Sequence, residues 1–204
     1  MSKIAIIGAT GRAGSQLLEE ALRRGHVVTA IARHASALPP RSGLSTRDVD
    51  VLDAAALREA LAGHDAVFSA ARFSGIPVGA VIDAVKQAGV PRLLVVGGAA
   101  SLFVAPGQRL LDSPTFPAAY KTEATAGAAY LEALRQQQDL DWTFLSPSAL
   151  FDGNQRTGQF RLGRDDLLVG ADGKSTISFP DFAIAFIDEL EKPEHSRQRF
   201  TVGY

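Results

Sequence analysis

The first candidate for chemistry is a glycine-rich segment close to the N-terminus. Gly8-Ala9-Thr10-Gly11-Arg12-Ala13-Gly14 directly follows the apolar run Ile4–Ile7 and precedes an amphipathic stretch. Small residues at such a turn let the backbone approach a pyrophosphate, whose charge is attracted by the free N–H groups of the helix N-terminus. A tight strand-to-helix turn needs glycine even without a ligand. Its place between strand and helix nevertheless favours a dinucleotide site that includes Gly8, Thr10, Gly11, Arg12 and Ala13.

Arg33 bears on which nucleotide binds. It follows the second apolar run, Val27–Ala32, where an acidic residue would bind the ribose 2′-hydroxyl and repel a 2′-phosphate. No Asp or Glu occurs between Glu20 and Asp48. Arg33 and Arg12 could both bind a 2′-phosphate, or both could be ordinary surface arginines. We predict NADP as the cofactor, with NADPH preferred over NADH.

Composition and charge exclude several other classes of protein. The 204 residues include no cysteine and carry a net charge of -1, so cysteine chemistry is excluded and nucleic acid is not a favoured partner. The four histidines lack metal-ligand spacing, and no metal is expected. The first strand begins at Lys3 and no uncharged run reaches the ~18 residues of a membrane span. We expect a cytoplasmic protein that acts on a small molecule, without nucleic-acid or membrane partners, as a monomer or homodimer.

The elements that position these residues follow from short apolar runs that alternate with amphipathic stretches. This alternation predicts an α/β fold, a Rossmann-like doubly wound parallel sheet. Gly25, Gly63 and Gly89 are placed to end helices, and Asp53 to begin one. The expected strands are Ile4–Ile7, Val27–Ala32, Thr46–Val51, Ala66–Ser69, Leu93–Val96 and Trp142–Leu145.

After Pro147 the sequence becomes rich in glycine. Asp172-Gly173 predicts a hairpin between Leu167–Val169 and Thr176–Ile177, and a last helix is expected over Asp181–Leu190. We expect one NAD(P)-binding domain over residues 1–204. Within it, residues from about 148 to 204 should form a small C-terminal lobe over the substrate cleft, at the ends of the strands.

Taken together, these motifs identify a family resemblance. With GATGRAG, Arg33 and the segment Asp-Trp-Thr-Phe-Leu-Ser-Pro-Ser at 141–148, the chain resembles the atypical short-chain dehydrogenases/reductases of the NAD(P)H-binding or NADH-flavin reductase type. It is also similar to the biliverdin-IXβ/flavin reductases. The resemblance covers nearly the whole chain, and its motifs specify the cofactor better than the substrate.

The resemblance implies further site residues. Asp50 and Val51 would flank the adenine, and Ser101 would approach the nicotinamide. Backbone near Pro147 would contact the carboxamide. Asp50 could instead cap a turn, and the Ser101 hydroxyl could bind within its own loop. The residues implied to line the cofactor beyond the fourth strand are Ala70, Ala71 and Arg72.

The chain departs from the superfamily at its usual acid, a tyrosine four residues before a lysine. That spacing places both on one helix face, where the cation lowers the pKa of the phenol. Neither Tyr120 nor Tyr130 has this lysine, and Lys121 would lie about 100° around the helix from Tyr120. A Tyr-Lys proton relay is therefore not supported, and Ser101 and Tyr120 are the catalytic candidates.

Three functions fit these observations. Hydride transfer from NADPH to a flavin or a similar planar conjugated acceptor comes first, because it needs placement more than a strong acid. The alternatives are a non-catalytic NADP(H)-binding redox sensor or regulatory protein, and a carbonyl or sugar reductase or epimerase. Five loop phenylalanines could form a planar slot or simply pack in the core: Phe73, Phe103, Phe116, Phe151 and Phe160.

Overall fold

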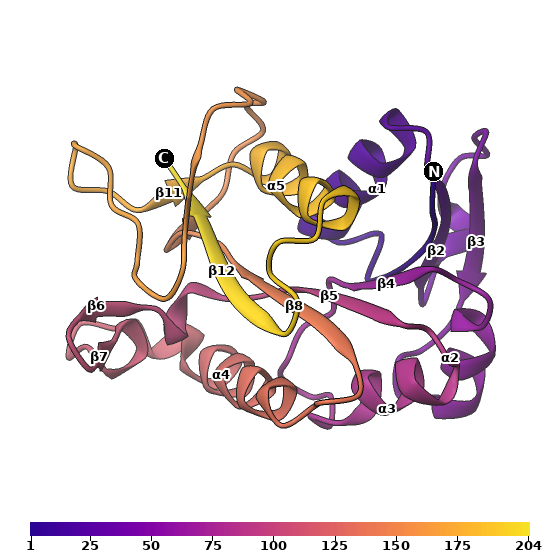
Figure 1. Cartoon of the computed structure of the whole chain (residues 1–204), viewed down its shortest axis with the longest axis horizontal. Helices are drawn as coiled ribbons and strands as arrows, with labels where there is room; N and C mark the ends of the chain where they lie inside the picture. Colours follow the sequence, from indigo (N-terminus) through magenta and orange to yellow (C-terminus); the bar gives the residue numbers. More distant parts are fainter.

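An eight-stranded sheet forms the centre of the molecule, in the order β10-β12-β8-β5-β4-β1-β2-β3 (Figure 1). The computed structural model describes all residues, 1–204. All neighbouring strands pair in parallel except β10 and β12, which are antiparallel. The strands are β1 (Lys3–Ile7), β2 (Val27–Ala32), β3 (Leu44–Asp48), β4 (Ala66–Ser69), β5 (Arg92–Val96), β8 (Asp141–Ser146), β10 (Arg161–Gly163) and β12 (Gln198–Gly203).

Helices cover both faces of the sheet. α1 (Arg12–Arg23) and α5 (Phe179–Glu191) lie on one face. α2 (Ala54–Leu61), α3 (Ala80–Gln87) and α4 (Lys121–Arg135) lie on the other (Figure 1). Successive strand residues therefore enter different cores. Ile4 and Ile6 pack in the core beneath α1 and α5, the first core, and Ala5 and Ile7 pack in the core beneath α2, α3 and α4, the second core. The predicted doubly wound α/β sheet is confirmed.

Local sequence signals mark the helix ends. Gly25, Gly63 and Gly89 have φ of 80°, 74° and 69°, as expected of residues that end helices. The Asp53 carboxylate accepts the Ala56 N–H at 3.0 Å and begins α2. The prediction for the third strand was shifted, because β3 ends at Asp48. The Asp48 carboxylate accepts the Ser36 N–H at 2.8 Å, and the chain then turns through Asp50–Asp53.

The C-terminal third is shared between the main sheet and a smaller extension. α5 completes the helix layer, and β12 and β10 complete the sheet, so only the segments around β10 between β8 and α5 lie apart. These segments contain β9 (Leu150–Phe151) and β11 (Thr176–Ile177), which pair in parallel. The turn at Asp172-Gly173 forms, with Gly170 N–H bonded to the Lys174 carbonyl at 2.7 Å.

The predicted hairpin partner was nevertheless wrong. Thr176–Ile177 pairs with Leu150–Phe151 instead of Leu167–Val169. The reason lies in another pairing, because the Leu167 N–H bonds to the Phe103 carbonyl at 2.8 Å. Phe103 belongs to a separate small hairpin of β6 (Phe103–Ala105) and β7 (Gln108–Arg109).

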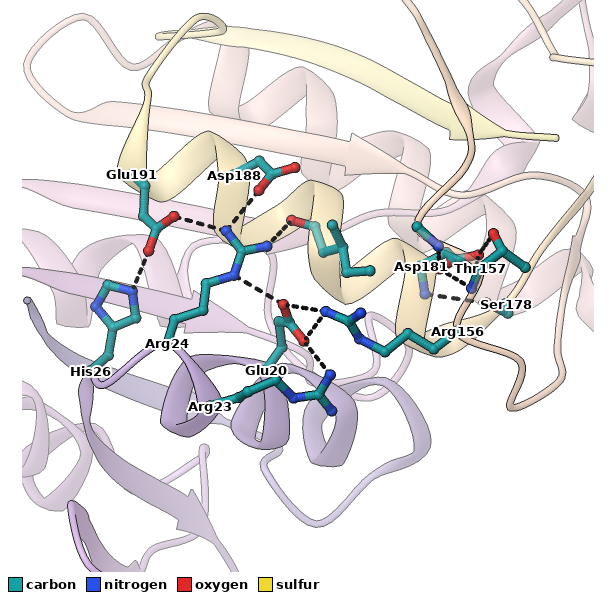
Figure 2. Close-up of polar contacts among 12 residues, drawn as sticks. Glu20, Arg23, Arg24, His26, Arg156, Thr157, Ser178, Asp181, Asp188 and Glu191 are labelled. Carbon is teal, nitrogen blue, oxygen red and sulfur yellow. Dashed lines mark hydrogen bonds and ion pairs between the residues drawn. The ribbon is translucent and has the colours of Figure 1, made fainter.

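Charged side chains join α1 to α5 and to the loop before it (Figure 2). Arg24, which directly follows α1, donates to Glu20 at 2.9 Å and to Asp188 of α5 at 2.7 Å. The Glu20 carboxylate, 4% exposed, also accepts from Arg156 at 3.1 Å. The loop that contains Arg156 is thereby held on the first helix. No helix is both long and apolar enough to cross a membrane.

Candidate functional site

The three glycines of the N-terminal loop have different structural roles. Gly8 has φ of 78°, and a Cβ there would lie 2.8 Å from the Ala70 carbonyl oxygen. A Cβ on Gly14 would lie 2.1 Å from the Gly8 carbonyl oxygen. Gly11 has φ of -75°, open to any residue, and its Cβ would contact only the Gly8 carbonyl oxygen, at 3.3 Å. The fold requires Gly8 and Gly14, whereas Gly11 keeps the exposed start of α1 free of a side chain.

The backbone at this helix start fits an anionic group. Ser15 has the first N–H of α1 that is bonded within the protein, to the Gly11 carbonyl at 2.8 Å. The N–H groups of Arg12 and Ala13 donate to no protein acceptor, and no side chain caps the helix. Exposed, unpaired N–H groups at the positive end of a helix are suited to a pyrophosphate. Ala70 and Ala71 lie beside this loop, since a Cβ on Gly8 would be 3.1 Å from the Ala71 nitrogen.

Arg33 lies at the carboxyl end of β2, beside the end of β3, where Ala32 pairs with Asp48. Its side chain is exposed and makes no hydrogen bond or ion pair within the protein, so it is free to bind a phosphate. Asp50 lies near this end of the sheet, and its carboxylate accepts the Leu52 N–H at 3.0 Å. The turn-capping interpretation of Asp50 is therefore confirmed. Its contact with adenine stays a prediction, as does that of Val51, which is half-buried against the second core.

Arg12 points toward the C-terminal part of the chain. Its guanidinium forms an ion pair with Asp152 and lies over the ring of Phe179, 4.6 Å from the ring centroid. Both side chains of the ion pair are largely exposed, at 69% and 77%, so water screens the interaction. The contact of Arg12 with a 2′-phosphate stays a prediction. Sequence reasoning had no signal for Asp152, which is distant along the chain.

A cavity of about 430 Å³ opens at the same edge of the sheet, beside the loop after β5. Glu123 is the only charged residue in its wall, which contains no Lys, Arg or His. The cavity brings Ser101 and Tyr120 together, and it includes two of the five predicted phenylalanines, Phe73 and Phe116. The rest of the wall is Gly97, Gly98, Ala99, Ala100, Leu110, Thr115, Pro117, Glu123, Ala124, Gly127, Ala128, Ala149 and Leu150.

The other three phenylalanines lie outside the cavity wall. Phe151 packs on Phe179 and Phe182, with ring centroids 4.3 and 4.7 Å away. Phe160 packs against the first core, and Phe103 is half-buried in β6. For these residues the core-packing interpretation describes their surroundings.

Glu123 of α4 binds the loop after β4. Its carboxylate accepts the N–H groups of Phe73 and Ser74 at 2.7 and 2.9 Å, and also the Ser74 hydroxyl. Burial would raise the pKa of Glu123, but these hydrogen bonds outweigh it and hold the pKa below its usual value. Arg72, which is exposed, lies 3.8 Å away. Glu123 is thus an ionised structural group of the cavity wall, and the sequence analysis did not identify it.

Ser101 ends the short helical turn η2 (Ala99–Ser101) after β5. Its hydroxyl oxygen accepts a hydrogen bond from Nη1 of Arg199 on β12, at 3.2 Å. The Arg199 side chain is 2% exposed, and its Nε donates to Asp165 at 2.8 Å. The interpretation that Ser101 bonds within its own loop is wrong, because its partner lies on a distant strand.

Tyr120 ends the turn η4 (Ala118–Tyr120), and Lys121 begins α4. Tyr120 is 66% exposed and lines the cavity together with Ala124, four residues later. Ala124 therefore occupies the place where a Tyr-x-x-x-Lys pair would put its lysine. Tyr130 is buried, which raises the pKa of its phenol, and it faces the core. The cavity wall therefore contains a tyrosine but no lysine.

The remaining candidates lie around this edge or away from it. Pro147 is buried between β8 and β9, close to Ala149 of the cavity wall. None of the histidines lines the cavity. His64, for example, is buried against Thr29, and burial lowers its pKa. No three or more His, Asp or Glu side chains are grouped to hold a metal ion.

The fold and the loop together define a class, that of Rossmann-like nucleotide-binding proteins, with the glycine turn and the cavity at the carboxyl ends of the parallel strands. Residues 8–193 match the model of the NAD(P)H-binding family, and the chain belongs to this family.

Several individual proteins are similar to this chain over nearly their whole length. The uncharacterized protein YwnB of Bacillus subtilis (strain 168) is 45% identical, with 98% of this chain and 97% of that protein covered. A crystal structure named "putative epimerase", from Bacteroides thetaiotaomicron, is 44% identical with a TM-score of 0.94, over 99% of this chain and 96% of its own. One named "putative NADH-flavin reductase", from Streptococcus pneumoniae TIGR4, is 36% identical with a TM-score of 0.86, over 100% and 99%.

Proposed function

We propose that this protein is an NADPH-dependent reductase that transfers hydride to a flavin or a similar planar conjugated acceptor. The observation that carries the proposal is the cavity, whose wall is mostly apolar and contains Phe73, Phe116 and Tyr120. It opens at the same edge of the sheet as the glycine loop. The similarity to the Streptococcus pneumoniae protein supports the same reaction class.

The cofactor would be held by this chain's own groups. The N–H groups of Arg12 and Ala13 would bind the pyrophosphate, and the free guanidinium of Arg33 would bind the 2′-phosphate of NADPH. NADPH supplies a hydride when bound. NADH would leave Arg33 without a partner, which is why NADPH is the preferred cofactor in this proposal.

The cavity suits an acceptor that needs no strong acid. In a flavin, the negative charge gained with the hydride spreads over the ring, and water can supply the proton. An isolated ketone would localise the charge on one oxygen, where a positioned acid contributes about 10²- to 10⁴-fold. Four residues after Tyr120 the wall has Ala124 instead of a lysine, and Glu123 is held ionised by the loop after β4. These features support a flavin over a carbonyl or sugar substrate.

The test is turnover of NADPH with a panel of acceptors. Purified protein is mixed with NADPH, then with riboflavin, quinones, biliverdin or simple ketones, and the loss of reduced-nicotinamide absorbance is followed. We expect turnover with riboflavin and little with ketones. Biliverdin should be a poor substrate, because its carboxylates would meet a wall without any cation. NADPH binding without turnover of any acceptor would contradict the proposal and favour a redox sensor.

A further inference from the structure

We propose that Arg199 is a positioning residue that acts through Ser101 and, with it, takes the place of the missing Tyr-Lys pair. In this arrangement the buried guanidinium orients the Ser101 hydroxyl toward the acceptor and stabilises the negative charge that the acceptor gains. The inference rests on the proposed function, since it concerns the hydride acceptor in the same cavity.

The donors and acceptors of the two side chains determine what the Ser101 hydroxyl proton can bind. A guanidinium has only donors, so in the 3.2 Å contact the Ser101 oxygen accepts from Nη1 of Arg199. The hydroxyl proton is then left for another acceptor, and it donates to no group of the protein. Because Ser101 lines the cavity, a bound acceptor is the group that can receive this hydrogen bond.

Three distant segments fix this arrangement. The Phe103 N–H bonds to the Asp165 carbonyl at 2.8 Å, which ties the chain after Ser101 to the segment before Leu167. The Asp165 carboxylate in turn accepts from Nε of Arg199 at 2.8 Å. Arg199 has little freedom to turn away from Ser101, since its side chain is buried and bonded to Asp165.

As in a Tyr-Lys pair, a cation lies beside a hydroxyl, but here the hydroxyl does not transfer its proton. An alcohol is too weak an acid to give up its proton near neutral pH, so Ser101 keeps it and contributes a hydrogen bond. The acceptor gains one hydrogen and two electrons as the hydride, and it then takes a proton from water. Hydrogen bonds that are already in place and directed at developing charge are among the strongest contributions to catalysis.

A double-mutant cycle tests whether Arg199 acts through Ser101. We expect Ser101→Ala and Arg199→Leu each to lower kcat for riboflavin by about 10- to 100-fold. This loss is smaller than for a reaction whose negative charge is localised on one oxygen. The double variant should be at most about threefold slower than Ser101→Ala, because Arg199 acts through the hydroxyl that Ser101→Ala already removes. KM for NADPH should change little, and Arg199→Lys should recover part of the rate. Multiplicative losses in the double variant, or a normal kcat in Arg199→Leu, would overturn the proposal.

Two controls separate this role from a structural one. Arg161→Leu removes an arginine of the neighbouring strand β10, one that bonds only to the backbone carbonyls of Val169 and Tyr204. It should leave kcat unchanged. NADPH affinity by calorimetry and the thermal midpoint of every variant show whether the fold is kept, and Arg199→Gln replaces Arg199→Leu should the latter unfold.

A binding readout keeps the test independent of turnover. The probe is 8-hydroxyriboflavin, whose ring hydroxyl ionises to a charge spread over the flavin. Bound to wild-type protein it should titrate at a lower pKa than when free, and Ser101→Ala and Arg199→Leu should both lose this shift. An unshifted pKa, or no binding, counts against the inference. A wild type that binds NADPH and shifts the probe without turnover contradicts the proposed function alone.

Discussion

At the scale of single residues, cofactor preference depends on the free guanidinium of Arg33. Charge-assisted hydrogen bonds to a phosphate contribute about 1.5 to 3 kcal/mol, or about tenfold or more in affinity. We expect Arg33→Asp to lower the ratio of NADPH to NADH affinity by at least about tenfold, because the carboxylate would repel the 2′-phosphate and accept from the 2′-hydroxyl. Calorimetric titration with each cofactor measures both constants.

The matched control for Arg33 is Arg58→Asp, which makes the same change of charge at an exposed arginine on α2. This variant should keep the wild-type ratio of affinities. If Arg33→Asp also keeps that ratio, the residue does not contact the phosphate, and Arg12 becomes the remaining candidate for it.

Gly11 gives the second prediction at this scale. Its φ of -75° suits any residue, and an added Cβ meets only one carbonyl oxygen at 3.3 Å. We therefore expect Gly11→Val to remain folded by circular dichroism but to lose NADPH binding, since the side chain would cover the unpaired N–H groups. Gly25→Ala is the control: it strains a residue with φ of 80°, costs about 1 kcal/mol of stability and leaves binding intact. Normal NADPH affinity in Gly11→Val would remove the glycine loop from the site.

At the scale of elements, the junction of η4 and α4 separates Tyr120 from Lys121. The two residues are adjacent in the chain, and Ala124 is the residue that shares the cavity wall with Tyr120. We expect Tyr120→Phe and Lys121→Ala each to lower riboflavin turnover by less than about tenfold, well below the 10²- to 10⁴-fold of a general acid. Ser101→Ala should cost more than either. Steady-state kinetics at saturating NADPH provide the comparison.

A loss of three orders of magnitude in Tyr120→Phe, with NADPH binding intact, would contradict the acid-free mechanism. It would also make reduction of a carbonyl compound the better proposal. Tyr130→Phe is the matched control, because that tyrosine is buried in the second core and is not part of the cavity wall.

Elements set by local signals could be predicted from the sequence. The alternation of apolar runs, the glycines that end helices and the Asp53 cap all depend on neighbours a few residues away. They placed β1, β2, β4, β5 and β8 correctly and β3 with a shift, whereas β10 and β12 were not predicted. The partner of Thr176–Ile177 depends on Phe103 pairing with the segment around Leu167, which no local pattern encodes.

The site residues also fall into those marked by local sequence and those that are not. The glycine loop could be predicted from a continuous motif, and Arg33 from its place directly after the second strand. The Arg199–Ser101 contact spans 98 residues along the chain, and Arg12 and Asp152 are separated by 140. Such pairs have no sequence spacing to mark them, so the fold had to be known before their roles could be inferred.

At the scale of the whole molecule, the chain between β8 and α5 is fixed to the main fold by buried charges (Figure 2). Asp181, in the first turn of α5, is fully buried. Its carboxylate accepts the N–H groups of Thr157 and Gly158, both at 2.9 Å, and the Tyr204 hydroxyl at 2.7 Å. These bonds join the loop before α5 and the C-terminal residue to one side chain.

The same contacts make stability depend on pH. Burial would raise the pKa of Asp181, but the hydrogen bonds from Thr157, Tyr204 and Gly158 outweigh it, and the folded-state pKa lies below the usual value. A lowered folded-state pKa stabilises the protein above the unfolded pKa of about 3.9, and this contribution is lost as pH falls through the folded pKa.

We therefore expect Asp181→Asn to lower the free energy of unfolding at pH 7 by about 3 kcal/mol, because several charge-assisted hydrogen bonds to a buried carboxylate are lost. Below about pH 4 the difference from wild type should shrink progressively, since the unfolded wild-type chain takes up the proton first and the folded carboxylate follows at its lower pKa. Urea unfolding at several pH values measures both effects. Asp172→Asn, at an exposed turn carboxylate that accepts only the Lys174 N–H, should change stability by less than about 0.5 kcal/mol. An Asp181→Asn difference that is constant from pH 7 to pH 3 would show that its ionisation does not stabilise the fold.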